Sequence, residues 1–323
     1  MFSFAKAKGT ANIVMDDYVI RMLENKGSDL DSLQMAVEKP LPKQVIENGR
    51  IIDELAFFEF MKEAVQEWGI KGCYVRFFVP QSLVIIREID LPDDVTADKA
   101  KSYIHLEIGN TIHFPFKNPI FDMYQTDEEA NKVTIIAAPE DELLKYTHTF
   151  TDLSLKPTVA ELQPLGIYRY FLHKQGTMSP EKVYMIIEYS LSSVTISIFH
   201  QNKVEFVRHQ PLTTSKDYWQ FNEEIASFEF TGDRMRYEGE IEDQLNEIDR
   251  LRNFYRFSIH HGEKEVNELL IVGDSPDKAK IAELIKARYN VAVSLLKTDE
   301  QVAGERIESS FIPALGLALR GGK

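Results

Sequence analysis

The residues that could ligate a metal or act as nucleophiles are few and dispersed. The 323-residue chain has eight histidines and one cysteine, and the adjacent histidines are His260 and His261. Zinc requires several converging ligands, whereas a histidine pair that closes a polar helix is typical of C-terminal capping or solvent exposure. Cys73 lies on the apolar side of an alternating strand, where a thiol is buried and unreactive. We expect neither a metal site nor a cysteine nucleophile.

Three acidic pairs could serve acid–base chemistry or bind magnesium: Asp16–Asp17, Asp93–Asp94 and Glu223–Glu224. Magnesium sites use few protein carboxylates and depend on substrate phosphates. Turns favour aspartate, so solvated turns are the expected setting of these pairs, with Asp16–Asp17 at the tip of a hairpin. The sequence also lacks a Walker loop, a dinucleotide fingerprint, paired cysteines and the HExxH spacing. It therefore predicts no catalytic residues.

Composition limits the classes of function. A chain of this length with 44% hydrophobic residues can bury a large core in two or more domains. The net charge of −14 opposes contact with nucleic acid. The sequence contains no run of 18 apolar residues, so no membrane-spanning helix is predicted. A single cysteine and the lack of an apparent leader peptide favour a cytoplasmic location for the protein.

Hydrophobic periodicity predicts alternating strands and helices in both halves. A hairpin is expected at residues 11–24 and a helix at 54–68, with Asp53 as its N-cap and Gly69 beyond its end. Further strands are expected at 73–79, 83–91, 120–124, 133–138, 183–189, 194–199, 204–210, 269–272 and 291–295. Further helices are expected from residue 96, and at 140–152, 161–173, 241–260, 276–289 and 311–320. This is a mixed α/β pattern.

Three segments together resemble the PilM family of type IV pilus assembly proteins. The first is VIIREIDLP at residues 84–92, followed by a helix and IHFPF at 112–116. The second pairs VTIIAAP at 133–139 with LKPTVAELQPL at 155–165. The third is the C-terminal FIPALGLALR at 311–320. The resemblance runs in consistent order over residues 11–321.

The resemblance implies an α/β, actin-like (ribonuclease H-like) fold similar to that of FtsA, with two lobes and a small inserted α+β subdomain. Residues 1–82 and 155–178 would form lobe 1, residues 83–154 the insert and residues 179–323 lobe 2. The C-terminal helix at 311–320 would pack at the interface between the lobes.

The nucleotide-site motifs of the family are altered in this chain. The family's first phosphate hairpin is rich in glycine, whereas residues 12–21 contain none and place Asp16–Asp17 where phosphate would lie, which Coulomb repulsion opposes. The family's second phosphate hairpin corresponds to IEYSLSSVT at 187–195, and its adenosine turn corresponds to VGDS at 272–275. Each segment keeps only part of the family motif. Nucleotide contacts would fall on Ser190, Ser192, Ser193, Thr195 and Gly273. No cofactor and no catalysis are expected, although residual ATP and Mg binding stays open.

The resemblance implies a cytosolic scaffold that docks the cytoplasmic tail of a PilN-like inner-membrane protein, in a type IV pilus or a competence pseudopilus. Motor ATPases and self-association are further expected interactions. Arginine and aromatic residues dominate peptide-binding hot spots, so the groove lining is predicted at Arg87, Tyr103, Phe114 and Phe116. For the three aromatic residues, core packing within the insert is an equal alternative. Two other functions stay open: a nucleotide-dependent actin-like switch or weak ATPase, and the cytoplasmic part of a GspL-like secretion component.

Overall fold

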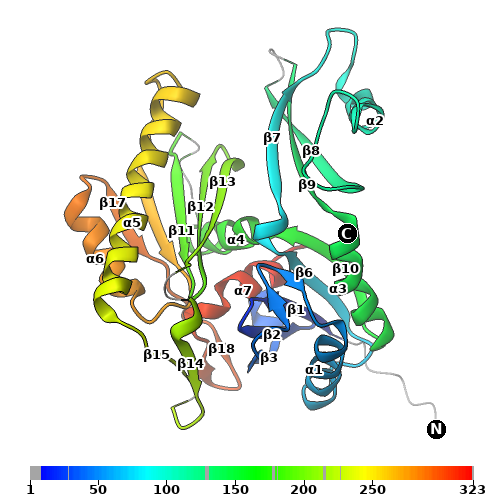
Figure 1. Cartoon of the computed structure of the whole chain (residues 1–323), viewed down its shortest axis with the longest axis vertical. Coiled ribbons are helices and arrows are strands. Elements are labelled where there is room, and N and C mark those ends of the chain that lie inside the picture. The colour runs from blue at the N-terminus through cyan, green and yellow to red at the C-terminus, as the bar shows by residue number, and fades with distance from the viewer. Residues whose placement is uncertain are drawn as a thin grey trace.

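Two five-stranded sheets with a layer of helices between them, and a smaller three-stranded sheet beside them, make up the computed structural model (Figure 1). The structure describes residues 9–27, 29–127, 131–176, 179, 181–213, 216–225 and 227–321. The predicted boundary between the lobes, near residue 178, falls outside these residues. We call the first sheet with its helices the first lobe and the second sheet with its helices the second lobe.

The first sheet has the strand order β10-β6-β1-β2-β3. Its strands are β1 (Thr10–Met15), β2 (Val19–Asn25), β3 (Leu33–Pro40), β6 (Tyr74–Val79) and β10 (Lys156–Leu162). Helices α1 (Glu54–Glu67) and α3 (Glu140–Asp152) cover one face, where Phe57, Phe77 and Phe150 share one core. The short strands β4 (Ile46–Glu47) and β5 (Arg50–Ile51) pair beside α1.

The second sheet has the strand order β13-β12-β11-β16-β17. Its strands are β11 (Tyr184–Tyr189), β12 (Ser193–His200), β13 (Lys203–Pro211), β16 (Glu268–Val272) and β17 (Ala292–Leu295). Helices α5 (Arg234–Asn253) and α6 (Lys278–Arg288) cover one face of this sheet. Two small hairpins, β14 (Trp219–Asn222) with β15 (Ser227–Phe230) and β18 (Gln301–Val302) with β19 (Glu305–Arg306), complete this half.

Helices α4 (Gln163–Gln175) and α7 (Ile312–Ala318) form the layer between the sheets. Their core includes Val14 from the first sheet and Ile186 from the second. The two helices approach so closely that a Cβ atom on Gly316 would lie 1.9 Å from the carbonyl oxygen of Gly166. Glycine at 316 therefore permits the crossing that brings the C-terminal helix against both lobes.

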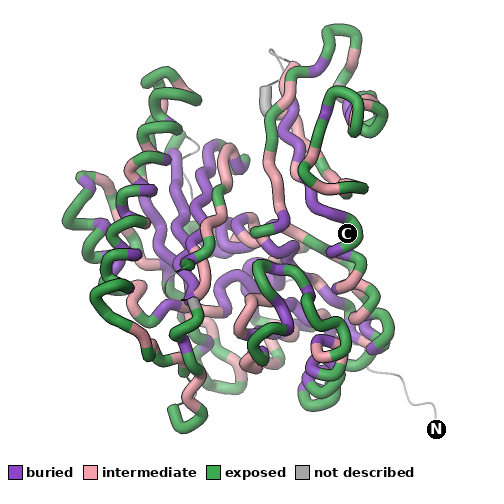
Figure 2. Tube along the Cα trace, in the orientation of Figure 1, coloured by how far each residue is buried: buried purple, intermediate pink, exposed green. Residues whose placement is uncertain are grey.

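The third sheet, with the order β7-β9-β8, forms the insert. It consists of β7 (Ile85–Asp90), β8 (Pro119–Asp127) and β9 (Lys132–Pro139), and α2 (Ala97–Glu107) packs on one face around Ile104 and Ile135. Figures 1 and 2 show the insert projecting from the first lobe opposite the second sheet, with few buried positions in α2. Tyr146 and Phe150 of α3 belong instead to the core of the first lobe.

Most predicted elements are present, with informative differences in two helices. The N-cap of α1 is confirmed, because the Asp53 carboxylate accepts a hydrogen bond from the backbone N–H of Ala56. The predicted helix at 161–173 begins later, because residues up to Leu162 extend β10. The predicted helix at 241–260 is wrong at both ends: α5 begins at Arg234, where Asp233 caps it, and residues 254–259 form a π-helical turn.

Candidate functional site

The turns of two hairpins and one loop meet between the lobes. The turn between β1 and β2 carries Asp16 and Tyr18, the turn between β11 and β12 carries Ser190, and Gly273 and Asp274 directly follow β16. These segments line a common space, which we call the interlobe cleft. It is the place where the family resemblance puts a nucleotide.

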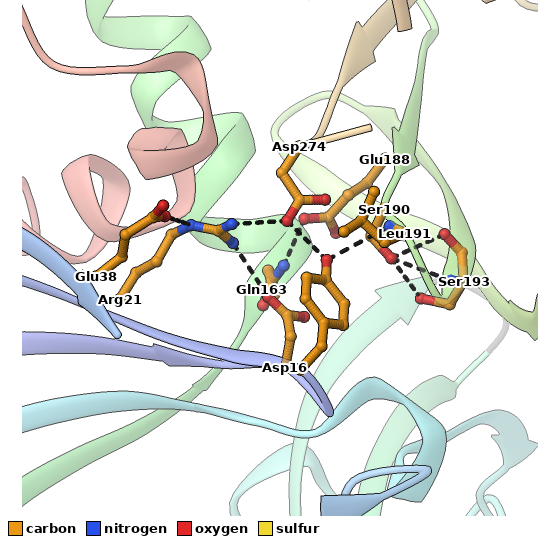
Figure 3. Close-up of polar contacts among 10 residues, drawn as sticks. Asp16, Arg21, Glu38, Gln163, Glu188, Ser190, Leu191, Ser193 and Asp274 are labelled. Carbon is orange, nitrogen blue, oxygen red and sulfur yellow. Dashed lines mark hydrogen bonds and ion pairs between the residues drawn. The ribbon is translucent and has the colours of Figure 1, made fainter. Parts of the chain in front are cut away.

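Arg21 of β2 is the central cation of this cleft (Figure 3). Its guanidinium donates to Asp274 at 2.7 Å, to Glu38 at 2.8 Å and to Asp16 at 3.4 Å. The register of the first sheet places Glu38 directly opposite Arg21. The arginine side chain is only 5% exposed, and a buried cation is stable only where carboxylates surround it. Burial alone would lower the pKa of Arg21, but Asp274 and the other acidic groups raise it well above its usual value.

Tyr18 fills the space between the two hairpins. Its hydroxyl donates to Asp274 at 2.7 Å and accepts a hydrogen bond from the backbone N–H of Leu191 at 3.4 Å. Its ring packs edge-on against Phe228 of β15, with centroids 5.3 Å apart. The phenol oxygen thus engages a backbone amide of the hairpin that was predicted to contact phosphate.

The hydroxyl residues that were predicted to contact a nucleotide form hydrogen bonds within the protein. The Ser190 hydroxyl accepts from the Ser193 backbone N–H at 3.1 Å and lies 3.0 Å from the Ser193 hydroxyl. Ser192 accepts a backbone hydrogen bond from Leu212 at 2.7 Å. Thr195 pairs with His209 Nδ1 at 3.0 Å. The structure therefore brings all four hydroxyl residues to the cleft, where three of the four side chains have protein partners.

Gly273 is required by the packing of its own backbone. It has φ of +123°, and a Cβ atom there would lie 2.1 Å from the carbonyl oxygen of Tyr189. No other residue fits without moving β11 or β16. The glycine that was predicted to approach a ligand instead allows the loop carrying Asp274 to lie directly on β11.

Two acids, the half-buried Asp16 and the buried Glu188, lie beside Arg21. Burial, with the neighbouring Asp274, raises the pKa of Asp16 to about 7. Burial, with the neighbouring Asp16, raises the pKa of Glu188 to about 8, although Gln163 donates a hydrogen bond to it. Both groups therefore hold a proton over part of the neutral range.

The space left between these groups is small. It measures about 60 Å³, whereas pockets for small ligands typically measure roughly 300–1,000 Å³. The Tyr18 hydroxyl and the Arg21 guanidinium bridge the two lobes here through Leu191 and Asp274.

A second, larger cavity lies between the insert and the second sheet, and we call it the insert slot. Its volume is about 400 Å³. Three segments line it: Asn48, Gln81 and Ser82 from the first lobe; Val84 and Ile86 at the start of β7; and Val207, His209 and Pro211 from β13. Burial lowers the pKa of His209 to about 4, so the slot is lined by uncharged groups at neutral pH. The insert also contacts the second lobe directly. The Tyr124 hydroxyl donates to the carbonyl of Val204, and the Lys203 ammonium donates to the carbonyl of Gln125.

The predicted groove residues gather elsewhere. Tyr103, Phe114 and Phe116 pack against the core between α2 and the insert sheet, and the two phenylalanine rings stack with centroids 5.6 Å apart. Arg87 donates to the carbonyl of His113 at 3.3 Å. Side chains alternate along β7, so Arg87 and Ile86 lie on opposite faces. None of the four lines the insert slot.

One expectation about chemical groups is wrong. Asp16 is not in a solvated turn, because it faces Arg21 in the cleft with 22% of its side chain exposed. His260 is the C-cap residue of the helical segment 254–259, as expected, and its Nε2 also lies 3.1 Å from Glu205. Cys73 is buried, as expected. Within the described residues, no three His, Cys, Asp or Glu side chains are arranged to hold a metal, and no helix has the length and apolarity needed to cross a membrane.

Sequence reasoning missed Tyr18 and Arg21 as residues of the cleft. Arg21 offered one signal, because a charge within the apolar run Val19–Asn25 needs a partner once the strand is buried. Asp274 lies in the VGDS turn at 272–275, but its partners are more than 250 positions away in the sequence. The residues that line the insert slot carry no chemical signal of this kind.

Comparison with solved structures defines the class of the fold. A Bacteroides thetaiotaomicron protein with an actin-like ATPase fold matches with a TM-score of 0.50, 13% identity and coverage of 92% of this chain and 94% of that chain. The ethanolamine utilization protein EutJ from Carboxydothermus hydrogenoformans matches with a TM-score of 0.50, 10% identity and coverage of 98% and 91%. The predicted actin-like α/β fold is confirmed.

The particular family follows from two further matches. The family model described as type IV pilus assembly protein PilM matches residues 15–233, and this chain belongs to that family. A structure of a PilM–PilN type IV pilus biogenesis complex matches with a TM-score of 0.73, 19% identity and coverage of 97% of this chain and 98% of that chain. No curated protein matches the chain. The predicted family is confirmed, and it places the chain in type IV pilus assembly.

Proposed function

We propose that this chain is a noncatalytic scaffold that docks the cytoplasmic tail of a PilN-like inner-membrane protein during assembly of a type IV pilus or a competence pseudopilus. In this proposal the protein lies in the cytoplasm, at the inner face of the plasma membrane, and is held there by its partner. Its family and its similarity to a chain of a PilM–PilN complex support a partner of this kind.

The observation that carries the proposal is the contrast between two neighbouring cavities. Tyr18, Arg21 and Asp274 fill the interlobe cleft and leave about 60 Å³. The insert slot keeps about 400 Å³. In this proposal docking needs no nucleotide.

The shape and chemistry of the insert slot suit an extended peptide. One wall is β13, the edge strand of the second sheet, and an edge strand presents unpaired backbone groups to an added strand. The carbonyl of Val204 on β13 accepts a hydrogen bond from Tyr124 of the insert, so the insert lies beside this strand. Apolar Val84 and Ile86 on the opposite wall would receive alternate side chains of the peptide.

A nucleotide-dependent switch is the second candidate. The hydroxyl residues Ser190, Ser193 and Thr195 lie at the cleft, as that function requires. It would need Tyr18 and Arg21 to leave the space between the hairpins. Under this alternative Mg-ATP stabilises the protein, whereas under the scaffold proposal it does not.

A binding experiment tests the scaffold proposal. The full chain is titrated against a fluorescent peptide that carries the cytoplasmic tail of the PilN-like protein from the same organism, with and without Mg-ATP. We expect nucleotide-independent binding that Ile86→Glu weakens at least about tenfold, equivalent to about 1.4 kcal/mol. Leu106→Glu, on the exposed side of α2, is the control and should bind as the wild type does. Equal affinity of wild type and Ile86→Glu would refute docking in the slot.

A further inference from the structure

Asp274 of the second lobe is held by two residues of the first. Its Oδ2 atom accepts from the Tyr18 hydroxyl and from Arg21 Nη2, each at 2.7 Å (Figure 3). The side chain of Asp274 is 8% exposed and that of Arg21 is 5% exposed. These contacts therefore form a shielded connection between the lobes.

Both ends of this connection are rigid. On the second lobe, Gly273 lies directly against the backbone of Tyr189, and the Ser275 N–H donates to the Tyr189 carbonyl at 3.3 Å. On the first lobe, the Tyr18 carbonyl accepts from the Leu41 N–H at 2.8 Å. Because neither end can adjust locally, rotation of one lobe against the other must break the contacts of Asp274.

Separating the lobes would also leave Arg21 without its shortest carboxylate contact while the rest of the side chain stays enclosed by β1 and β3. Removing one partner of a buried charge is disfavoured, and Arg21 would keep only Glu38 and Asp16. Two-lobed proteins commonly close around a bound ligand that bridges their lobes. Here the bridging groups belong to the chain itself.

We propose that Tyr18, Arg21 and Asp274 form an interlobe latch that holds the two lobes in one fixed arrangement without any ligand. The latch also fixes the width of the insert slot, because one wall contains Gln81 of the first lobe and the other Val207 of the second. The effect on docking rests on the proposed function, whereas the latch itself does not.

Distance measurement between spin labels tests the latch. Labels are placed on the full chain at Glu63→Cys in α1 and Glu283→Cys in α6, whose side chains are 71% and 73% exposed. Cys73 is 5% exposed and is buried from the label. We expect the otherwise wild-type chain to give one narrow distribution that millimolar Mg-ATP does not change. Asp274→Asn should broaden and shift it by several ångströms.

The control and a milder variant make the test decisive. Glu247→Gln removes an equally buried carboxylate, also 8% exposed, from a pair with Arg208 that lies within the second lobe, and should leave the distribution unchanged. Tyr18→Phe removes both hydroxyl contacts but keeps the ring on Phe228, so it reports on the latch even if Asp274→Asn does not fold. The proposal is overturned if folded latch variants keep the wild-type distribution, or if Mg-ATP shifts that of the wild type. Neither result depends on whether a peptide binds.

Discussion

The interlobe cleft and the insert slot share lining residues but differ in how their polar groups are satisfied. In the cleft, one arginine contacts three carboxylates, and a tyrosine hydroxyl bonds to one of them. In the slot, amide, hydroxyl and aliphatic groups surround an open volume. Charged contacts therefore join the lobes at the cleft, whereas the neighbouring slot keeps the larger free volume.

Removing the central cation should have the largest effect on stability. Arg21→Met would leave Asp16, Glu38 and Asp274 close together in a buried site, and we expect a loss of about 3–5 kcal/mol of unfolding free energy, measured by urea denaturation. Arg208→Met is the matched control, because Arg208 is 49% exposed and half-exposed ion pairs contribute roughly 0–1 kcal/mol. Similar losses in both variants would contradict the account of the cleft.

Adding one methyl group at Gly273, beside the latch, should lower stability nearly as much as Arg21→Met does. Gly273→Ala would place a Cβ atom 2.1 Å from the Tyr189 carbonyl oxygen at a positive φ, and we expect a loss of roughly 2–3 kcal/mol. Thermal or urea unfolding measures it without any ligand. Gly239→Ala in α5, where a Cβ meets nothing within 4 Å, is the control. If Gly273→Ala proved as stable as the wild type, the glycine would serve something other than backbone packing.

The buried acids should produce a smaller, pH-dependent effect. The pKa values of Asp16 and Glu188, about 7 and about 8, lie above the ordinary unfolded values. Between about pH 4 and pH 8 the native state therefore binds more protons than the unfolded state, and the contribution of these groups to stability falls as pH rises. Relative to wild type, Glu188→Gln should gain about 1–3 kcal/mol from pH 5 to pH 9. A stability difference that is constant over this range would show that Glu188 is not held protonated.

The sequence predicted local structure well where one face of an element is buried. The α1 helix, its Asp53 cap and the β1–β2 hairpin follow from periodicity and turn residues. Strands β3 and β10 were missed. The residues of β3 are all exposed or half-buried, and those of β10 alternate between exposed and half-buried up to Leu162, so neither strand has a fully buried face. Local pattern carries little information about such strands.

The candidate site was predictable only in part, for a physical reason. Family motifs located the serine hairpin and Gly273, and the loss of glycine between Asn12 and Arg21 pointed to a poor phosphate site. The partners of Arg21 could not be identified, because the pair with Asp274 depends on how two sheets dock across the layer of α4 and α7. The aromatic residues Phe114 and Phe116 were assigned to a groove by composition, whereas the structure places them against the core of the insert.

A thermal-shift titration with Mg-ATP tests whether the protein's own side chains take the place of a nucleotide in the cleft. A ligand at about a hundred times its dissociation constant adds roughly 2.7 kcal/mol to stability. We predict no rise in melting temperature up to millimolar Mg-ATP. A clear, saturable rise would contradict the account and identify the protein as a nucleotide-dependent switch.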